Sequence, residues 1–170
     1  MYYYKLKKKS IICIEGKDTT SFLQGIITNN INKLKTDRVI YSTLLSSQGK
    51  LLHDFFLFKD MGTNNSKTSV NYPDYAHKLS KKVSNNSKNI GILVCGSGMG
   101  MSMAANKHKK IRAAVCYSVK NAKLSRLHNN ANIITLGSRL TNKNTAFKCI
   151  EAFVNTKFEG GRHKKRVKKI

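Results

Sequence analysis

A cysteine followed by a glycine-rich turn is the part of this sequence best suited to chemistry. Residues 91–107 read Gly-Ile-Leu-Val-Cys-Gly-Ser-Gly-Met-Gly-Met-Ser-Met-Ala-Ala-Asn-Lys, so an apolar run ends at Cys95 and glycines then alternate with other residues. This order predicts a strand, a loop and a helix, with the thiol and backbone N–H groups at the strand end where open α/β folds bind ligands. Such a turn can hold an anionic oxygen that develops during a reaction. The alternatives are a tight strand-to-helix connection and a Cys95 that is simply a small buried hydrophobe.

The known nucleotide-binding and metal-binding patterns do not fit this chain. The glycine turn lacks the Gly-Lys-Ser/Thr ending of a phosphate loop and the spacing of a dinucleotide fingerprint. The four cysteines have no C-x-x-C or metal spacing, which predicts reduced thiols. No apolar stretch approaches about 20 residues, and the run at 11–14 is too short for a signal segment. We therefore expect a cytoplasmic protein that does not interact with membranes.

The pattern of apolar residues changes near residue 60. Beyond it, strands are expected at 90–95, 111–116 and 131–136, and helices at 72–83, 102–107, from Ser118 to about His128, and at 146–154. Alternation of this kind predicts a parallel sheet covered by helices on both faces. Before residue 60 we expect a strand at 10–14, a short helix capped by Asp18, and a β-hairpin of 39–45 and 51–58 around a turn at 46–50.

The charge of the chain is strongly positive. Lys and Arg number 32 against 8 Asp and Glu, which gives a formal net charge of +24. A polyanion such as RNA is one explanation, and a general drift of composition toward Lys, Asn, Ser and Ile is the other. Drift is favoured because the lysines are spread along the chain. The clusters at 5–9 and 162–169 still predict weak, salt-sensitive and non-specific binding of nucleic acid.

Five motifs in order resemble ribose-5-phosphate isomerase B, a sugar-phosphate isomerase family that shares its fold with the galactose-6-phosphate isomerase subunits. They lie within about residues 60–170, at 93–107, 111–114, 125–132, 136–139 and 158–170, and 60–63 and 71–76 match as well. The resemblance implies interconversion of ribose 5-phosphate and ribulose 5-phosphate through an enediolate in the pentose phosphate pathway. It also implies an open three-layer Rossmann-like sheet, no metal or organic cofactor, and a homodimer or higher oligomer with sites at the interface.

The same resemblance assigns roles around the glycine turn. Cys95 takes the place of the base in one branch of the family, while the other branch carries a Glu where this chain has Met101. The thiol needs a lowered pKa to act, and we expect the helix N-terminus to lower it. Ser97 would pass a proton between sugar oxygens, and Tyr72 would line the sugar site. The enediolate would be held by the backbone amides around Gly96, Ser97, Gly98 and Gly100.

Other roles fall later in the chain. His128 resembles the histidine that helps to open the furanose ring, and Asn129 follows it in the family pattern. Arg139, Arg162 and Arg166 match phosphate- or substrate-binding arginines, which suits the bidentate pairing of guanidinium with phosphate. The alternative for His128 is a histidine that only caps the end of a helix, and the alternative for Arg162 and Arg166 is a basic tail exposed to solvent.

The N-terminal part departs from the family. The family begins with a strand that ends in an Asp-His pair, and no such pair precedes residue 60. Residues 10–58 instead resemble the start of folate-binding proteins related to the glycine-cleavage T protein, including iron–sulfur repair factors. We therefore expect a truncated T-protein-like segment at 1–58 and an N-terminally truncated isomerase domain at 59–170.

A gene fusion would account for this arrangement. We expect the junction to lie inside the isomerase's second strand, with 55–61 as that strand and the hairpin of 39–58 partly filling the gap left by the first. An isomerase with impaired activity is the leading hypothesis. An inactive fusion remnant and a basic RNA- or folate-binding module remain the alternatives.

Overall fold

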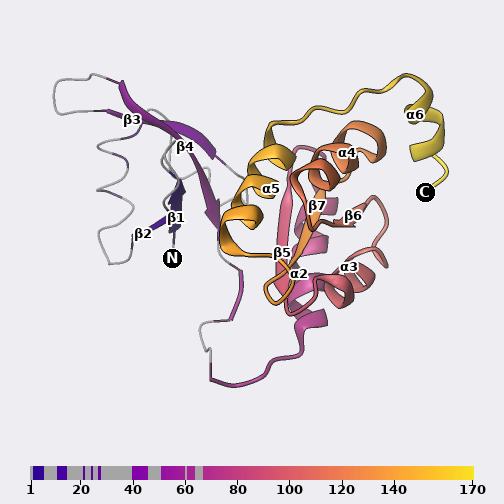
Figure 1. Ribbon diagram of the computed structural model, residues 1–170, viewed down its shortest axis with the longest axis horizontal. Helices are drawn as coiled ribbons and strands as arrows, with labels where there is room; N and C mark the ends of the chain where they lie inside the picture. The colour runs from indigo at the N-terminus through magenta and orange to yellow at the C-terminus, as the bar shows by residue number, and fades with distance from the viewer. Residues whose placement is uncertain are drawn as a thin grey trace. The chain divides into compact units, whose positions relative to one another are not determined.

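The computed structural model describes residues 2–5, 11–14, 21, 24, 27, 40–45, 51–59, 61–63 and 67–170. The chain divides into two compact units, Met1–Gly62 and Thr63–Ile170, which Figure 1 shows in indigo to purple and in magenta to yellow. Each unit has its own sheet, and each is described separately below.

The first unit contains a four-stranded antiparallel sheet. Its strands are β1 (Tyr2–Lys5), β2 (Ile11–Ile14), β3 (Ile40–Leu45) and β4 (Leu51–Lys59), in the order β2-β1-β4-β3. The expected strand at 10–14 and the expected hairpin are confirmed as β2 and as β3 with β4. The sequence pattern did not predict β1, which pairs with both β2 and β4. The expected Asp18-capped helix and the turn at 46–50 lie outside the residues that the structure describes.

Two expectations about the junction are wrong. Residues 55–59 do not form a strand of the isomerase sheet, because they belong to β4, where Phe55 pairs with Ser42 and Phe58 pairs with Tyr3. The hairpin of 39–58 adds no strand to the parallel sheet, because β3 and β4 belong to the antiparallel sheet of the first unit. An apolar run indicates a strand, but the choice of partner depends on long-range pairing that the run itself does not encode.

The second unit alternates helices with parallel strands. Its elements are α2 (Tyr72–Ser84), β5 (Gly91–Cys95), α3 (Met99–Ala105), β6 (Ala113–Val115), α4 (Val119–Asn129), β7 (Ile133–Gly137), α5 (Lys143–Asn155) and α6 (Gly161–Val167). The expected alternation is confirmed, although β6 is shorter than 111–116 and α3 begins earlier than 102. Ser118 caps α4 as expected, because its hydroxyl accepts the N–H of Asn121 at 3.2 Å. The pattern did not predict α6, whose polar residues surround the helix.

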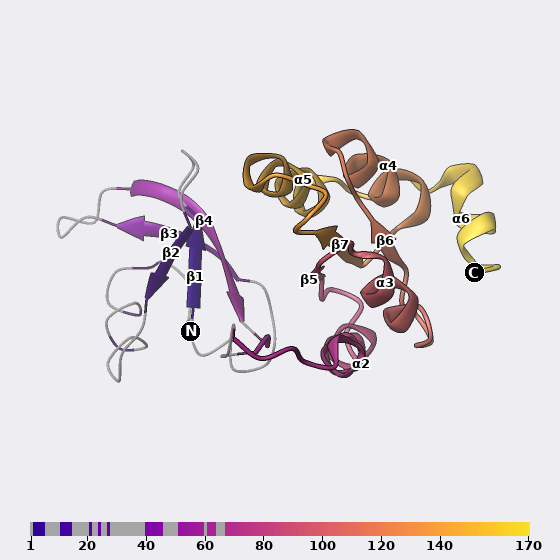
Figure 2. The same cartoon turned by 60° about the horizontal axis from the view of Figure 1, so that its bottom comes forward.

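The strands of the parallel sheet lie in the order β5-β7-β6, and the sheet is packed between two pairs of helices. Figure 2 shows α2 and α3 on one face and α4 and α5 on the other. Ile133 and Ile134 of β7 are both fully buried, because successive residues of this central strand face opposite cores. Ile133 packs with the α2–α3 side, and Ile134 packs with Phe153 and Cys149 of α5. This is the expected three-layer Rossmann-like architecture.

One side of this sheet ends at β5. Within the described residues β5 pairs only with β7, and Val94 on β5 leaves 54% of its surface exposed. This edge fits a sheet of this type that lacks its first strand. Among the described helices, none combines the length and apolar character needed to cross a membrane.

Candidate active site

Cys95 is the last residue of β5, at the carboxyl edge of the parallel sheet. Its side chain is partly exposed, and its Sγ accepts the N–H of Gly98 at 3.2 Å. The N–H of Met99 points to the Ser97 hydroxyl at 3.3 Å. The thiol and the turn therefore form one compact unit at the start of α3, as the sequence predicts.

The turn takes its shape from contact with the end of β7. Gly98 has φ +81°, and a Cβ at Gly137 would lie only 2.6 Å from the Ser97 carbonyl oxygen. Two hydrogen bonds fix the turn to the residues after β7: the Ser138 N–H donates to the Cys95 carbonyl at 2.8 Å, and the Arg139 N–H donates to the Gly96 carbonyl at 3.0 Å. The backbone around the thiol is thus held from both sides.

A cleft opens over this turn. It has a volume of about 340 Å³ and is lined by Tyr72, Cys95, Gly96, Ser97, Gly100, Arg139 and Leu140. The Tyr72 phenol at the start of α2 lies against Gly100, where a Cβ would collide with its hydroxyl. The Arg139 guanidinium lies over Gly96, with its Cζ 3.2 Å from where a Cβ would be. A thiol, a hydroxyl, a phenol and a guanidinium therefore surround one small space.

The two other cysteines of the second unit lie in the core, not in the cleft. Cys116 and Cys149 are fully buried between the sheet and the α4–α5 layer. Burial raises the pKa of the Cys116 thiol to about 11 and also raises the pKa of Cys149. Of the three cysteines in the second unit, Cys95 is the only one with its side chain partly at the surface.

The remaining predicted site residues lie elsewhere in this unit. His128 and Asn129 end α4, which leads back toward the start of β7. A helix that joins two parallel strands returns to the opposite edge of the sheet, and 11 residues of α-helix span about 16 Å. The structure thus brings Tyr72, Cys95 and Arg139 together in one cleft, but it does not bring His128 to them within one chain.

His128 has a different set of neighbours. Its Nε2 lies 3.7 Å from the Glu159 carboxylate, and the His163 Nε2 lies 3.8 Å from the same oxygen. The His128 and His163 rings stack with centroids 4.3 Å apart and planes 8° apart. Burial, followed by His128 and Arg162, lowers the pKa of His163. Sequence reasoning missed Glu159 and His163, and the only available signal was their spacing of four residues.

The segment after α5 is attached to α4 by its backbone. The Glu159 N–H donates to the Leu127 carbonyl at 3.1 Å, and the Arg126 Nε donates to the Thr156 carbonyl at 3.2 Å. Burial lowers the pKa of Arg126, whose guanidinium also lies 5.3 Å from the centre of the Phe153 ring. These contacts fix Glu159 beside the end of α4.

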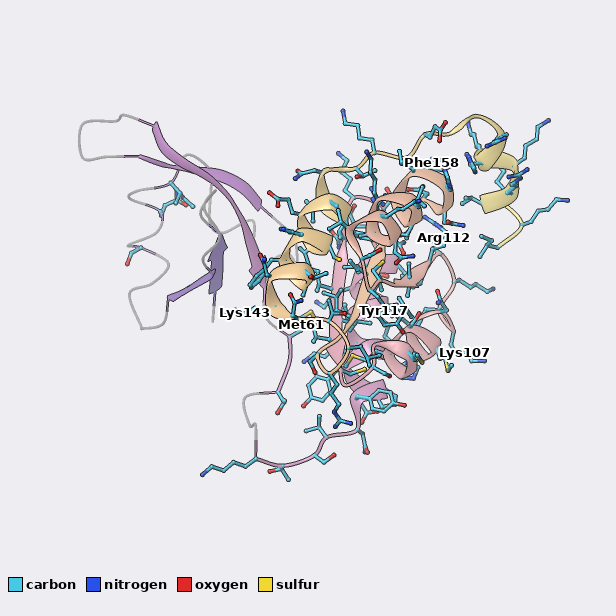
Figure 3. All side chains as sticks on the ribbon, in the orientation of Figure 1. Met61, Lys107, Arg112, Tyr117, Lys143 and Phe158 are labelled. Carbon is cyan, nitrogen blue, oxygen red and sulfur yellow. The ribbon has the colours of Figure 1, made fainter. Side chains whose placement is uncertain are left out.

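Arg162 and Arg166 lie on α6 and are both exposed. Figure 3 shows the long side chains of α6 extending away from the ribbon, as the side chain of the labelled Lys107 does after α3. Arg162 and Arg166 both lie near His163, since their charges help to lower its pKa.

The fold and the cleft are those of a parallel α/β enzyme that presents a thiol beside a glycine-rich turn at the end of a strand. Comparison with known proteins gives the family. The sequence profile described as Ribose/Galactose Isomerase matches residues 27–170, and the chain belongs to this family. The profile begins earlier than the resemblance at about residue 60. The likeness of 10–58 to folate-binding proteins stays a prediction.

Individual relatives agree with this assignment. Ribose-5-phosphate isomerase B of Escherichia coli K12 is 41% identical over 111 residues, which cover 65% of this chain and 74% of that protein. The crystal structure of ribose-5-phosphate isomerase B from Thermotoga maritima is 48% identical with a TM-score of 0.63, over 65% of this chain and 76% of that one. The Mycoplasma genitalium enzyme, crystallised with bound ribulose 5-phosphate, is 44% identical with a TM-score of 0.63 and coverages of 65% and 73%.

Proposed function

We propose that this chain interconverts ribose 5-phosphate and ribulose 5-phosphate through an enediolate, with activity reduced by the loss of the family's first strand. The observation that carries the proposal is the cleft that combines the Cys95 thiol with the glycine turn and Arg139. Ribulose 5-phosphate bound to the Mycoplasma genitalium relative supports the substrate class. The reaction would belong to the pentose phosphate pathway.

Cys95 is the proposed base. As thiolate it takes the proton from the carbon next to the sugar's carbonyl, and it returns the proton to the neighbouring carbon. The N–H of Gly98 on the sulfur supports negative charge there. A positioned base of this kind contributes about 100- to 10,000-fold to the rate.

The glycine turn is the proposed enediolate cradle. Because the N–H groups of Gly98 and Met99 already point to Cys95 and Ser97, the proposed donors are the amides of Gly96, Ser97 and Gly100. Each such donor is worth about 3 kcal/mol to the transition state. The Ser97 hydroxyl accepts from Met99 and keeps its own proton for transfer between the sugar oxygens.

Two copies of the chain would complete the site. His128 and Asn129 end the helix that leads back to the start of β7, whereas Cys95 lies at the end of β5. The helix α6, which carries Arg162 and Arg166, lies beside His128 through His163. One chain alone therefore cannot offer all of these groups to one sugar. We propose a homodimer in which one protomer supplies Cys95, Tyr72 and Arg139. The other protomer supplies His128 for ring opening and the α6 arginines for phosphate.

The reduced activity follows from what the sheet lacks. The family's first strand carries an Asp-His pair, and in the described residues β5 has no strand on its outer side. Without this pair, the proposed site loses one group for ring opening and one for phosphate. Open-chain sugar is then scarce, and the enolisation step at Cys95 has little substrate.

The test is formation of ribulose 5-phosphate from ribose 5-phosphate by the purified full chain. We expect measurable turnover well below that of the Escherichia coli relative, reduced about 100-fold or more by Cys95→Ala. Cys149→Ala, which removes a buried thiol outside the cleft, is the matched control. Turnover equal to that of the relative would refute the impairment. Turnover unaffected by Cys95→Ala would refute the base, and the absence of any turnover would favour an inactive remnant.

The dimer has its own measurement. Light scattering should give twice the chain mass, and mixing Cys95→Ala with His128→Ala protein should restore part of the turnover that each lacks. Complementation needs the two residues to act in the same site from different protomers. A monomeric chain that turns over substrate as fast as the dimer would contradict a site shared between two protomers.

A further inference from the structure

The cluster of His128, Glu159 and His163 has a geometry that neither hydrogen bonding nor the proposed isomerase reaction explains. Its three ligand atoms, two imidazole nitrogens and one carboxylate oxygen, lie within 4.8 Å of one another. The two nitrogen–oxygen distances are 3.7 and 3.8 Å, which are too long for hydrogen bonds. The three groups converge at ion-pair and stacking distance, with no hydrogen bond between them.

His163 makes this convergence significant. It is only 7% exposed, and its Nε2 is buried with no hydrogen-bond partner. A buried polar nitrogen is normally satisfied, so an unpartnered nitrogen that faces a carboxylate and a second imidazole calls for a ligand. The backbone that carries two of these groups is held in place, because the Glu159 N–H donates to the Leu127 carbonyl at 3.1 Å and the His163 N–H donates to the Gly160 carbonyl at 2.9 Å.

A metal ion accounts for the distances. Ligand atoms at about 2.0–2.1 Å from a tetrahedral zinc ion are roughly 3.3 Å apart, so the observed gaps need to close by less than an ångström for Glu159. The stacked rings must also tilt, since an imidazole binds a metal in its own plane. His128 is free to do so because its side chain is 38% exposed, whereas His163 is held in place.

We propose that His128, Glu159 and His163 form a three-ligand site for a divalent cation of the zinc class, with the fourth position open. Two imidazoles and one carboxylate suit zinc or cobalt, whereas magnesium and calcium prefer oxygen ligands throughout. The exposed basic residues of α6 repel a dication. The affinity for the cation should therefore increase with salt concentration, because salt screens this repulsion. A simple ion pair would be weakened by salt instead.

The site has a consequence for the reaction, which rests on the proposed function. An ion on His128 occupies the nitrogen that ring opening needs, so metal and sugar compete for one histidine. Metal binding itself is independent of the isomerase activity, and its test uses no turnover measurement.

The experiment is a titration of the purified, chelator-treated full chain with cobalt and with zinc, followed by absorption spectroscopy and calorimetry. We expect one ion per chain, with the ligand-field bands of a nitrogen–oxygen site and no thiolate charge-transfer band. Glu159→Gln should weaken binding about tenfold or more. This carboxylate is 59% exposed, so the variant should fold, as circular dichroism can verify.

Two further variants complete the design. His163→Asn should also weaken binding, while His108→Asn, from the separate His77–His108 pair, should leave it unchanged. Equal affinity in Glu159→Gln and the parent chain would overturn the proposal. Binding that is lost on alkylation of the cysteines or in His108→Asn would assign the ion to other residues and would overturn it as well.

Discussion

Replacing Gly137 with alanine tests whether the turn after Cys95 depends on its contact with β7. A Cβ at this position would lie 2.6 Å from the Ser97 carbonyl oxygen, 2.7 Å from its carbonyl carbon and 3.0 Å from its Cα. All three are backbone atoms, so no side chain can rotate away to make room. Either the end of β7 or the turn after Cys95 must move.

The cost can be estimated from the packing. Overpacking a tight site costs about 1–3 kcal/mol, and a backbone collision belongs at the upper end, about 2–3 kcal/mol. In a domain near the size of the second unit, each kcal/mol lowers the melting temperature by about 4–8 °C. We therefore expect Gly137→Ala to melt roughly 10–20 °C below the parent chain.

The assay is thermal unfolding followed by far-ultraviolet circular dichroism, which reports mainly on the helices α2–α5 of the second unit. Gly96→Ala is the matched control, because its Cβ would meet only the exposed, flexible Arg139 side chain. Its stability should stay within about 0.5 kcal/mol of the parent. If Gly137→Ala melted at the same temperature as Gly96→Ala, contact with β7 would not be what fixes the turn.

Iodoacetamide near neutral pH should alkylate Cys95 but not Cys116, whose pKa is raised to about 11 by burial. Peptide mass spectrometry measures this, and alkylation of Cys116 before Cys95 would contradict the prediction. Phe153→Ala, at a fully buried position, should lower the free energy of unfolding in urea by about 3–5 kcal/mol. Burial and the neighbouring His77 lower the pKa of His108, so stability should fall as the pH drops below about 6.5. His108→Asn should flatten that dependence in melts at several pH values, and an unchanged slope would exclude His108 as its source.

Much of the second unit could be predicted because its signals are local. The apolar run that ends at Cys95, the glycines that follow and the capping Ser118 each act within a few residues of sequence. Strand, loop, helix and N-cap were therefore recognisable in order, and the structure confirms them.

The elements that the sequence pattern did not predict are stabilised by contacts with residues far away in the chain. The strand β1 is a short, partly basic segment whose pairing with β4 spans more than fifty residues. The helix α6 has no apolar stripe and is anchored through His163. The wrong assignment of 55–59 has the same cause, since a run of apolar residues does not name its partner strand.

The sequence by itself determined which groups the turn contains, because the thiol at the strand end and the alternating glycines are neighbours in the chain. Only the tertiary structure decided which groups meet. Folding placed Tyr72 and Arg139 over the turn from two other segments of the chain. It also put His128 at the opposite end of the strands from Cys95 and stacked it against His163, 35 residues later in the chain. Contacts between distant residues follow from how helices and strands pack, and packing is a property of the whole unit.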